Sequence, residues 1–195
     1  MNEVMKNILT RRSIRTYKEG QISDNQLSSI IEAGKYAPSG GNSQTWRFTV
    51  VQNKEKLEQL NALVRDGFKN LEVDEKTYRS KKSGKKAAEN DNYNFYYNAP
   101  TLIIVSNDRE YSNCMADSSA AIENILLAAH SIGLGACFIN QLTWFCDNKD
   151  LRKYLTEIQI PENYVICGAV AVGYNSSSIL PKAAPRKEGT VDILR

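Results

Sequence analysis

Three arginines and a serine lie within five residues near the start of the chain, in the run R-R-S-I-R at residues 11–15. The guanidinium group of arginine donates paired hydrogen bonds that match the oxygens of a phosphate, and a serine hydroxyl can add another. The run therefore fits a binding site for a phosphate group. Basic runs are also common on solvated surfaces and in nucleic-acid-binding patches, so this run alone leaves those alternatives open.

A second polar cluster follows at residues 37–47, which read A-P-S-G-G-N-S-Q-T-W-R. Pro38 is rigid, the adjacent Gly40 and Gly41 permit close approach of the backbone, and the amides of Asn42 and Gln44 offer donors and acceptors together. Such a loop could bind the edge of a heterocyclic ring. Taken alone, it is also typical of an ordinary turn between a helix and a strand.

Taken together and in this order, the two segments resemble the nitroreductase family of FMN-dependent oxidoreductases, which pairs an R-x-S-x-R element with a later P-S-x-x-N-x-Q-x-W loop. Residues 117–140 resemble the central helix of that family and its G-L-G turn, and residues 185–187 resemble its C-terminal P-R-K element. The resemblance covers nearly the whole chain. Thr45 departs from it, because the family very often has proline before the tryptophan, and this frees a backbone N–H in the loop.

The resemblance implies an enzyme that transfers hydride from NADH or NADPH through FMN to a nitroaromatic, a quinone or a similar small-molecule acceptor by a ping-pong mechanism. It also implies a homodimer with FMN at the interface and an exchanged C-terminal arm. Carried over by position, the phosphate contacts are Arg11, Ser13 and Arg186, with Arg12 and Lys187 beside them. Arg15 is expected at the N1/O2 edge of the ring. The backbone of Leu134 and Gly135 is expected at the O4/N5 side.

The loop is expected to line the flavin, from across the interface, through Pro38, Ser39, Gly40, Asn42 and Gln44. No residue stands out as a general acid, so we expect no catalytic protein side chain, and the cofactor to carry the chemistry. Three alternatives remain open. They are a specialised flavoenzyme of the same fold (a dehydrogenase, a dehalogenase or a flavin-cleaving enzyme), a non-enzymatic FMN-binding protein, and a nucleic-acid-binding domain that uses residues 11–15.

Composition agrees with a single domain that spans residues 1–195. The chain has 42% hydrophobic residues, which suffices for one full core. Its 25 basic and 22 acidic residues give a net charge of +3, too balanced to require a nucleic acid or a membrane as partner. Without an apolar run of roughly 18 to 20 residues or a signal-peptide pattern at the N-terminus, we expect a soluble, cytoplasmic protein.

Four cysteines without C-x-x-C spacing and a single histidine, His130, make a metal site improbable. The expected state of the cysteines is therefore that of reduced, buried thiols. His130 lies in the middle of an apolar helical pattern, which favours a structural role for it.

Hydrophobic periodicity places the two polar clusters on secondary structure. It predicts a first helix that delivers residues 11–15, a second helix that begins with a capping box at Ser23 and Gln26 and stops at Pro38, and a strand at 46–52. It further predicts an amphipathic helix at 54–71, buried strands at 101–106 and 164–172, and a buried helix at 114–132 that Gly133 ends. This mixture indicates an α+β fold with a central mixed sheet flanked by helices.

Two regions carry little core-forming sequence. Residues 72–98 are rich in charge up to Tyr93, and they could form either a cover over the site or a solvated helix and loop. In the cover, Tyr93, Phe95 and Tyr96 would suit a planar substrate. Residues 173–195 form a tail without a core of its own, which either frays or docks on another surface.

Overall fold

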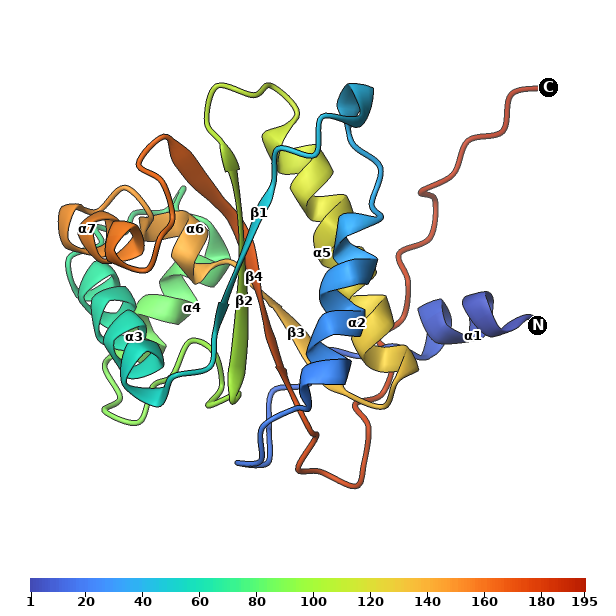
Figure 1. The fold of residues 1–195 in the computed structure, drawn as a ribbon, viewed down its shortest axis with the longest axis horizontal. Helices are drawn as coiled ribbons and strands as arrows, with labels where there is room; N and C mark the ends of the chain where they lie inside the picture. Colours follow the sequence, from blue (N-terminus) through green and yellow to red (C-terminus); the bar gives the residue numbers. More distant parts are fainter.

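One antiparallel sheet of four strands organises the computed structural model, which describes all 195 residues (Figure 1). Its strands, in spatial order, are β1 (Arg47–Val51), β2 (Thr101–Asp108), β4 (Tyr164–Gly173) and β3 (Gly135–Ile139). The helices are α1 (Glu3–Thr10), α2 (Asp24–Lys35), the 3-10 helix η1 (Gly40–Asn42), α3 (Lys54–Lys69), α4 (Arg79–Ala88), α5 (Cys114–Ser131), α6 (Gln141–Phe145) and α7 (Lys149–Glu157).

Local sequence explains where several of these elements begin and end. The side chain of Ser23 accepts the N–H of Gln26, and the Gln26 side chain accepts the N–H of Ser23, so the capping box predicted for the second helix is confirmed. The buried helix α5 ends just before Gly133, whose φ of 78° is accessible to glycine without strain. The sequence patterns predicted no element within residues 135–160, where β3, α6 and α7 lie.

Helices cover both faces of the sheet. Figure 1 shows α2 and α5 on one face and α3, α4, α6 and α7 on the other. Along β2 the side chains of Ile103 and Val105 enter the core under α2 and α5, whereas Leu102 and Ile104 enter the opposite core. The α+β architecture with flanking helices is therefore confirmed.

The strand directions differ from the mixed sheet that we expected. All three strand pairs are antiparallel, and parallel pairing is confined to an isolated bridge between Ser13 and Ala136. A continuous apolar run is typical of a parallel strand because helices usually cover both faces of a parallel sheet. Here antiparallel strands are covered on both faces, and the same pattern results.

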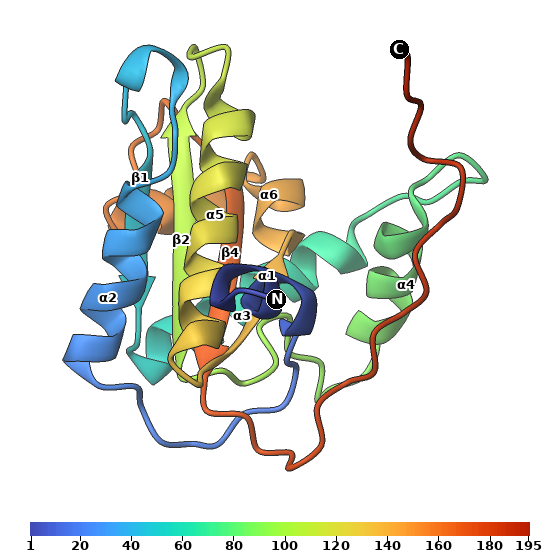
Figure 2. The same ribbon diagram turned by 90° about the vertical axis from the view of Figure 1, so that its right-hand side faces the viewer.

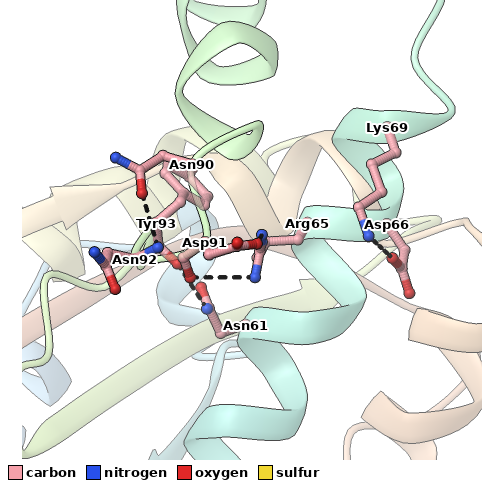
Figure 3. A network of polar contacts seen from close by, with 8 residues as sticks. All are labelled: Asn61, Arg65, Asp66, Lys69, Asn90, Asp91, Asn92 and Tyr93. Carbon is pink, nitrogen blue, oxygen red and sulfur yellow. Dashed lines mark hydrogen bonds and ion pairs between the residues drawn. The ribbon is translucent and has the colours of Figure 1, made fainter.

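Residues 72–98 are tied to the core. Phe95 and Tyr96 are only 1% and 4% exposed, so the expectation that they wall a substrate pocket is wrong. Figure 3 shows the polar contacts that fasten this segment to α3: Asn61 donates to the carbonyl of Tyr93 at 2.9 Å, and Arg65 donates to Asp91. The aromatic side chains pack inward because these contacts hold their backbone against α3.

The C-terminal arm, residues 174–195, leaves the sheet after β4 and runs along the outside of the molecule (Figures 1 and 2). It is attached at its start, where the N–H of Ser176 donates to the carbonyl of Thr16 at 3.2 Å. From residue 177 onward every residue is exposed. Separately, none of the helices combines the length and the hydrophobicity needed to cross a bilayer.

Candidate functional site

The arginine run lies directly against the start of β3. The N–H of Ile14 donates to the carbonyl of Ala136 at 3.0 Å, and Ser13 forms a parallel bridge with the same residue. Gly135 makes this approach possible, because a Cβ on it would lie only 3.0 Å from the Cβ of Ile14. The structure therefore brings the predicted residues Arg11, Arg12, Ser13 and Arg15 together with Leu134 and Gly135.

Arg11 and Arg12 differ in how their guanidinium groups are engaged. Nη1 of Arg12 donates to the carbonyls of Leu9 and Arg11, at 2.8 and 2.6 Å. Nε of Arg11 is buried and has no hydrogen-bond partner, and its nearest acidic group is the half-exposed carboxylate of Glu123 at 3.7 Å. A buried donor without an acceptor is costly. Arg11 is therefore the member of the run that best fits an additional anion.

Arg15 lies among residues that the sequence did not single out. Its guanidinium carbon is 5.7 Å from the centre of the Tyr97 ring. Burial lowers the pKa of Arg15, but Cys137, Tyr97 and Tyr17 raise it more, so the net pKa lies above the usual value. Arg15 is thus a fixed positive charge. No sequence pattern could have linked it to Tyr97, because more than 80 residues separate them.

Two neighbouring side chains complete this cluster. The hydroxyl of Tyr17 donates to the carbonyl of Ile14 at 2.6 Å, and burial raises the pKa of Tyr17 strongly. Burial likewise raises the pKa of the Cys137 thiol, although Arg15 and Ser13 partly oppose this shift. Both groups therefore remain neutral at physiological pH, and Arg15 keeps the positive charge of the cluster uncompensated.

Two hollows lie beside the arginine run. A cleft of about 470 Å³ separates residues 13–16 from residues 175–182 of the arm. A smaller one of about 200 Å³ is lined by Arg12, His130, Leu134 and Gly135, among others. Nε2 of His130 lies 3.0 Å from the hydroxyl oxygen of Thr10, and burial lowers the pKa of His130. This contact joins α1 to α5.

The second predicted cluster lies at the opposite end of α5. The N–H of Gly40 donates to Asp117, which lies in the first turn of α5. Arg12 instead lines a cavity together with His130, which lies in the last turn of α5. At 1.5 Å per residue, these two points on the helix are about 20 Å apart. Figure 1 shows η1 at one end of α5 and α1 near the other. Within one chain the structure does not bring the arginine run together with Pro38, Ser39, Gly40, Asn42 and Gln44.

The last two predicted residues, Arg186 and Lys187, lie on the exposed arm. The only side-chain hydrogen bond of Arg186 is to the carbonyl of Ala184, within the arm itself. Neither residue is joined to the arginine run of the same chain by a hydrogen bond or an ion pair.

Comparison with known proteins gives a consistent result. The profile described as "Nitroreductase family" matches residues 8–174. A nitroreductase of Bacteroides fragilis, solved with bound FMN, is 42% identical, with a TM-score of 0.89 and complete coverage of both chains. A nitroreductase of Desulfitobacterium hafniense, also solved with bound FMN, is 28% identical, with a TM-score of 0.82 and 99% coverage of both chains.

A further relative comes from Archaeoglobus fulgidus and is provisionally named NADH dehydrogenase/NAD(P)H nitroreductase. It is 34% identical over 179 residues, which cover 89% of this chain and 86% of the relative. The similarity therefore extends over the whole fold, including both polar clusters.

Proposed function

Because this chain belongs to the nitroreductase family, we propose that it is an FMN-dependent oxidoreductase that oxidises NADH or NADPH and reduces a small-molecule acceptor. Bound FMN supplies the two-electron chemistry. The observation that carries the proposal is the pairing of Ile14 with Ala136, which holds the arginine run against Leu134 and Gly135. In the same run, the buried Nε of Arg11 has no hydrogen-bond partner.

The residues of the run have distinct roles in this proposal. Arg11 and Ser13 bind the phosphate of the cofactor, with Arg12 beside them, because a guanidinium and a hydroxyl are strong donors to a dianion. Arg15 provides a fixed positive charge for the N1/O2 edge of the ring. The backbone of Leu134 and Gly135 approaches the O4/N5 side, where the absence of a side chain at Gly135 leaves room.

We further propose that the site is completed in a homodimer. The loop at residues 38–44 lies about 20 Å along α5 from the arginine run of its own chain, too far for both to bind one cofactor. The loop therefore serves the site of the partner subunit. The apolar side chains of Val4, Met5, Ile8 and Leu9 on α1 support this, since they are 45% to 67% exposed and gain burial only against another chain. The exposed arm would bring Arg186 and Lys187 to the phosphate.

Residues 1–195 then act as one domain, with a nitroaromatic, a quinone or a similar acceptor as second substrate in a ping-pong cycle. The four cysteines are unpaired, which fits a reducing compartment such as the cytoplasm.

The decisive experiment is the visible spectrum of the purified protein, followed by anaerobic titration with NADH and with NADPH. We expect a yellow protein that carries FMN and not FAD, because the run suits one terminal phosphate and the chain lacks a G-x-G-x-x-G turn for a pyrophosphate. We expect the colour to be bleached by at least one of the two nicotinamides. A colourless protein that takes up no added FMN contradicts the proposal.

A further inference from the structure

We propose that Asp117 and Tyr111 are positioning residues, which hold the loop at residues 38–44 in the conformation that binds the flavin. This inference rests on the proposed function. Asp117 is only 8% exposed, and its Oδ2 accepts two hydrogen bonds. One comes from the N–H of Gly40, at 3.0 Å, and the other from the hydroxyl of Tyr111, at 2.7 Å.

Tyr111 extends this contact to a second point of the loop. Its hydroxyl oxygen accepts the hydroxyl of Ser43 at 2.9 Å and lies 3.2 Å from the carbonyl of Gly40. A Cβ on Gly40 would lie 2.7 Å from the same hydroxyl and 2.5 Å from Nδ2 of Asn113, so a larger residue there would have to displace these side chains. Asp117 and Tyr111 together therefore hold the loop at both Gly40 and Ser43.

The loop needs such an anchor because its backbone is in an unfavourable conformation. Gln44 and Asn42 have φ values of 48° and 56°, in the left-handed region that residues with a Cβ disfavour, Gln44 more than Asn42. Gly41, at 58°, adopts the same region without strain. Inside the loop, Gln44 donates to Asn42 and to the Ser39 hydroxyl, but these hydrogen bonds are exposed to water. The contacts to Asp117 are partly buried, and buried hydrogen bonds hold geometry better than exposed ones.

Strained backbone that its surroundings hold in place is typical of binding sites. A loop fixed before the ligand arrives adds no ordering penalty on binding. If the anchor is lost, only a fraction of the molecules has the competent loop, and the apparent FMN dissociation constant rises by the inverse of that fraction.

The test compares FMN dissociation constants and release rates for Asp117→Ala, Asp117→Asn and Tyr111→Phe in the full-length protein. We expect a rise of about tenfold in the dissociation constant for Asp117→Ala, the effect of losing roughly one well-formed hydrogen bond. We expect a several-fold rise for Tyr111→Phe. Asp117→Asn should stay within about twofold of wild type, because an amide oxygen can accept both hydrogen bonds.

Tyr154→Phe is the matched control. It removes the hydroxyl of a tyrosine on α7, across the sheet, where the hydroxyl donates to the carbonyl of Lys56 at 3.4 Å. Thermal denaturation of each apoprotein separates lost stability from lost binding. The inference is overturned if Asp117→Ala and Tyr111→Phe both bind FMN as tightly as wild type. It is also overturned if Tyr154→Phe loses as much FMN affinity as these two variants do. A wild-type protein that binds no FMN instead overturns the proposed function.

Discussion

Arg11 stands out within the arginine run because its buried Nε lacks a hydrogen-bond partner, whereas Arg12 is turned toward backbone carbonyls. We predict that Arg11→Ala and Arg186→Ala each raise the FMN dissociation constant by about one to two decades. A charge-assisted contact to phosphate contributes roughly 1.5 to 3 kcal/mol, which corresponds to that range. Fluorescence titration of the apoprotein with FMN measures the change.

Arg195→Ala is the control for this prediction, since it removes an arginine from the same exposed arm at its last residue. Equal dissociation constants in all three variants would remove the phosphate assignment. If FMN affinity falls in Arg11→Ala but not in Arg186→Ala, the arginine run keeps its assignment to the phosphate and the proposed role of the arm is rejected.

Arg15 should act on the redox potential more than on affinity. Two-electron reduction of a flavin leaves negative charge near N1 and O2, so a guanidinium there stabilises the reduced form more than the oxidised form. At ~4 Å and an effective dielectric constant near 20, the interaction is about 4 kcal/mol before screening. We predict that Arg15→Gln lowers the two-electron potential by roughly 20 to 45 mV, for a net effect of ~1 to 2 kcal/mol.

Spectroelectrochemistry of the FMN-loaded variant measures this potential. Reduction by nicotinamide should also slow, while FMN affinity should fall less than in Arg11→Ala. An unchanged potential with a large loss of affinity would reassign Arg15 to the phosphate. No change in either quantity would leave its stacking on Tyr97 as a structural contact only.

Among the secondary-structure elements, the proposed site depends most on the contact between the arginine run and β3. Gly135 allows this contact, because a Cβ there would lie 2.9 to 3.1 Å from three side-chain carbons of Ile14. We predict that Gly135→Ala pushes Ile14 away from β3, disturbs Ser13 and weakens FMN binding by about tenfold or more. Ile14 is 4% exposed, so it has little space into which to move.

Gly20→Ala is the matched control, since nothing lies within 4 Å of a Cβ at Gly20. Titration with FMN and thermal denaturation of both variants test the prediction. If Gly135→Ala binds FMN as tightly as Gly20→Ala does, the close approach of residues 11–15 to β3 is not needed for the cofactor.

For the whole molecule, the proposal that each site uses the arginine run of one subunit and the loop of the other can be tested with mixed dimers. A dimer of one Arg11→Ala subunit and one Asp117→Ala subunit has one site in which both elements are intact and one site in which both are altered. We predict that such dimers, isolated with two different affinity tags, recover wild-type FMN affinity in half of their sites.

The opposite arrangement gives a different result. If the loop serves its own chain, each site of the mixed dimer carries one alteration, and no site regains wild-type affinity. The two parent homodimers supply the reference affinities. A protein that is monomeric by analytical ultracentrifugation contradicts the dimer on which this prediction depends.

The sequence alone determined the secondary structure around both polar clusters, and the family to which they point. Capping at Ser23 and Gln26, the left-handed turn at Gly133 and the periodicity of the long helices depend on residues a few positions apart. Such short-range patterns express local propensity, and for that reason they can be interpreted without a fold. The identities of the arginine run and of the amide loop were likewise available from the sequence.

Only the tertiary structure decided the strand directions, the burial of Phe95 and Tyr96, and the neighbours of the candidate site. Asp117 reaches Gly40 across 77 positions, and Tyr97 reaches Arg15 across more than 80. Neither pair leaves a periodic signal, because contacts of this kind arise from how strands pair and how helices pack on the sheet. The two polar clusters lie close in sequence yet about 20 Å apart along α5, because α2, which joins them in the chain, packs along α5.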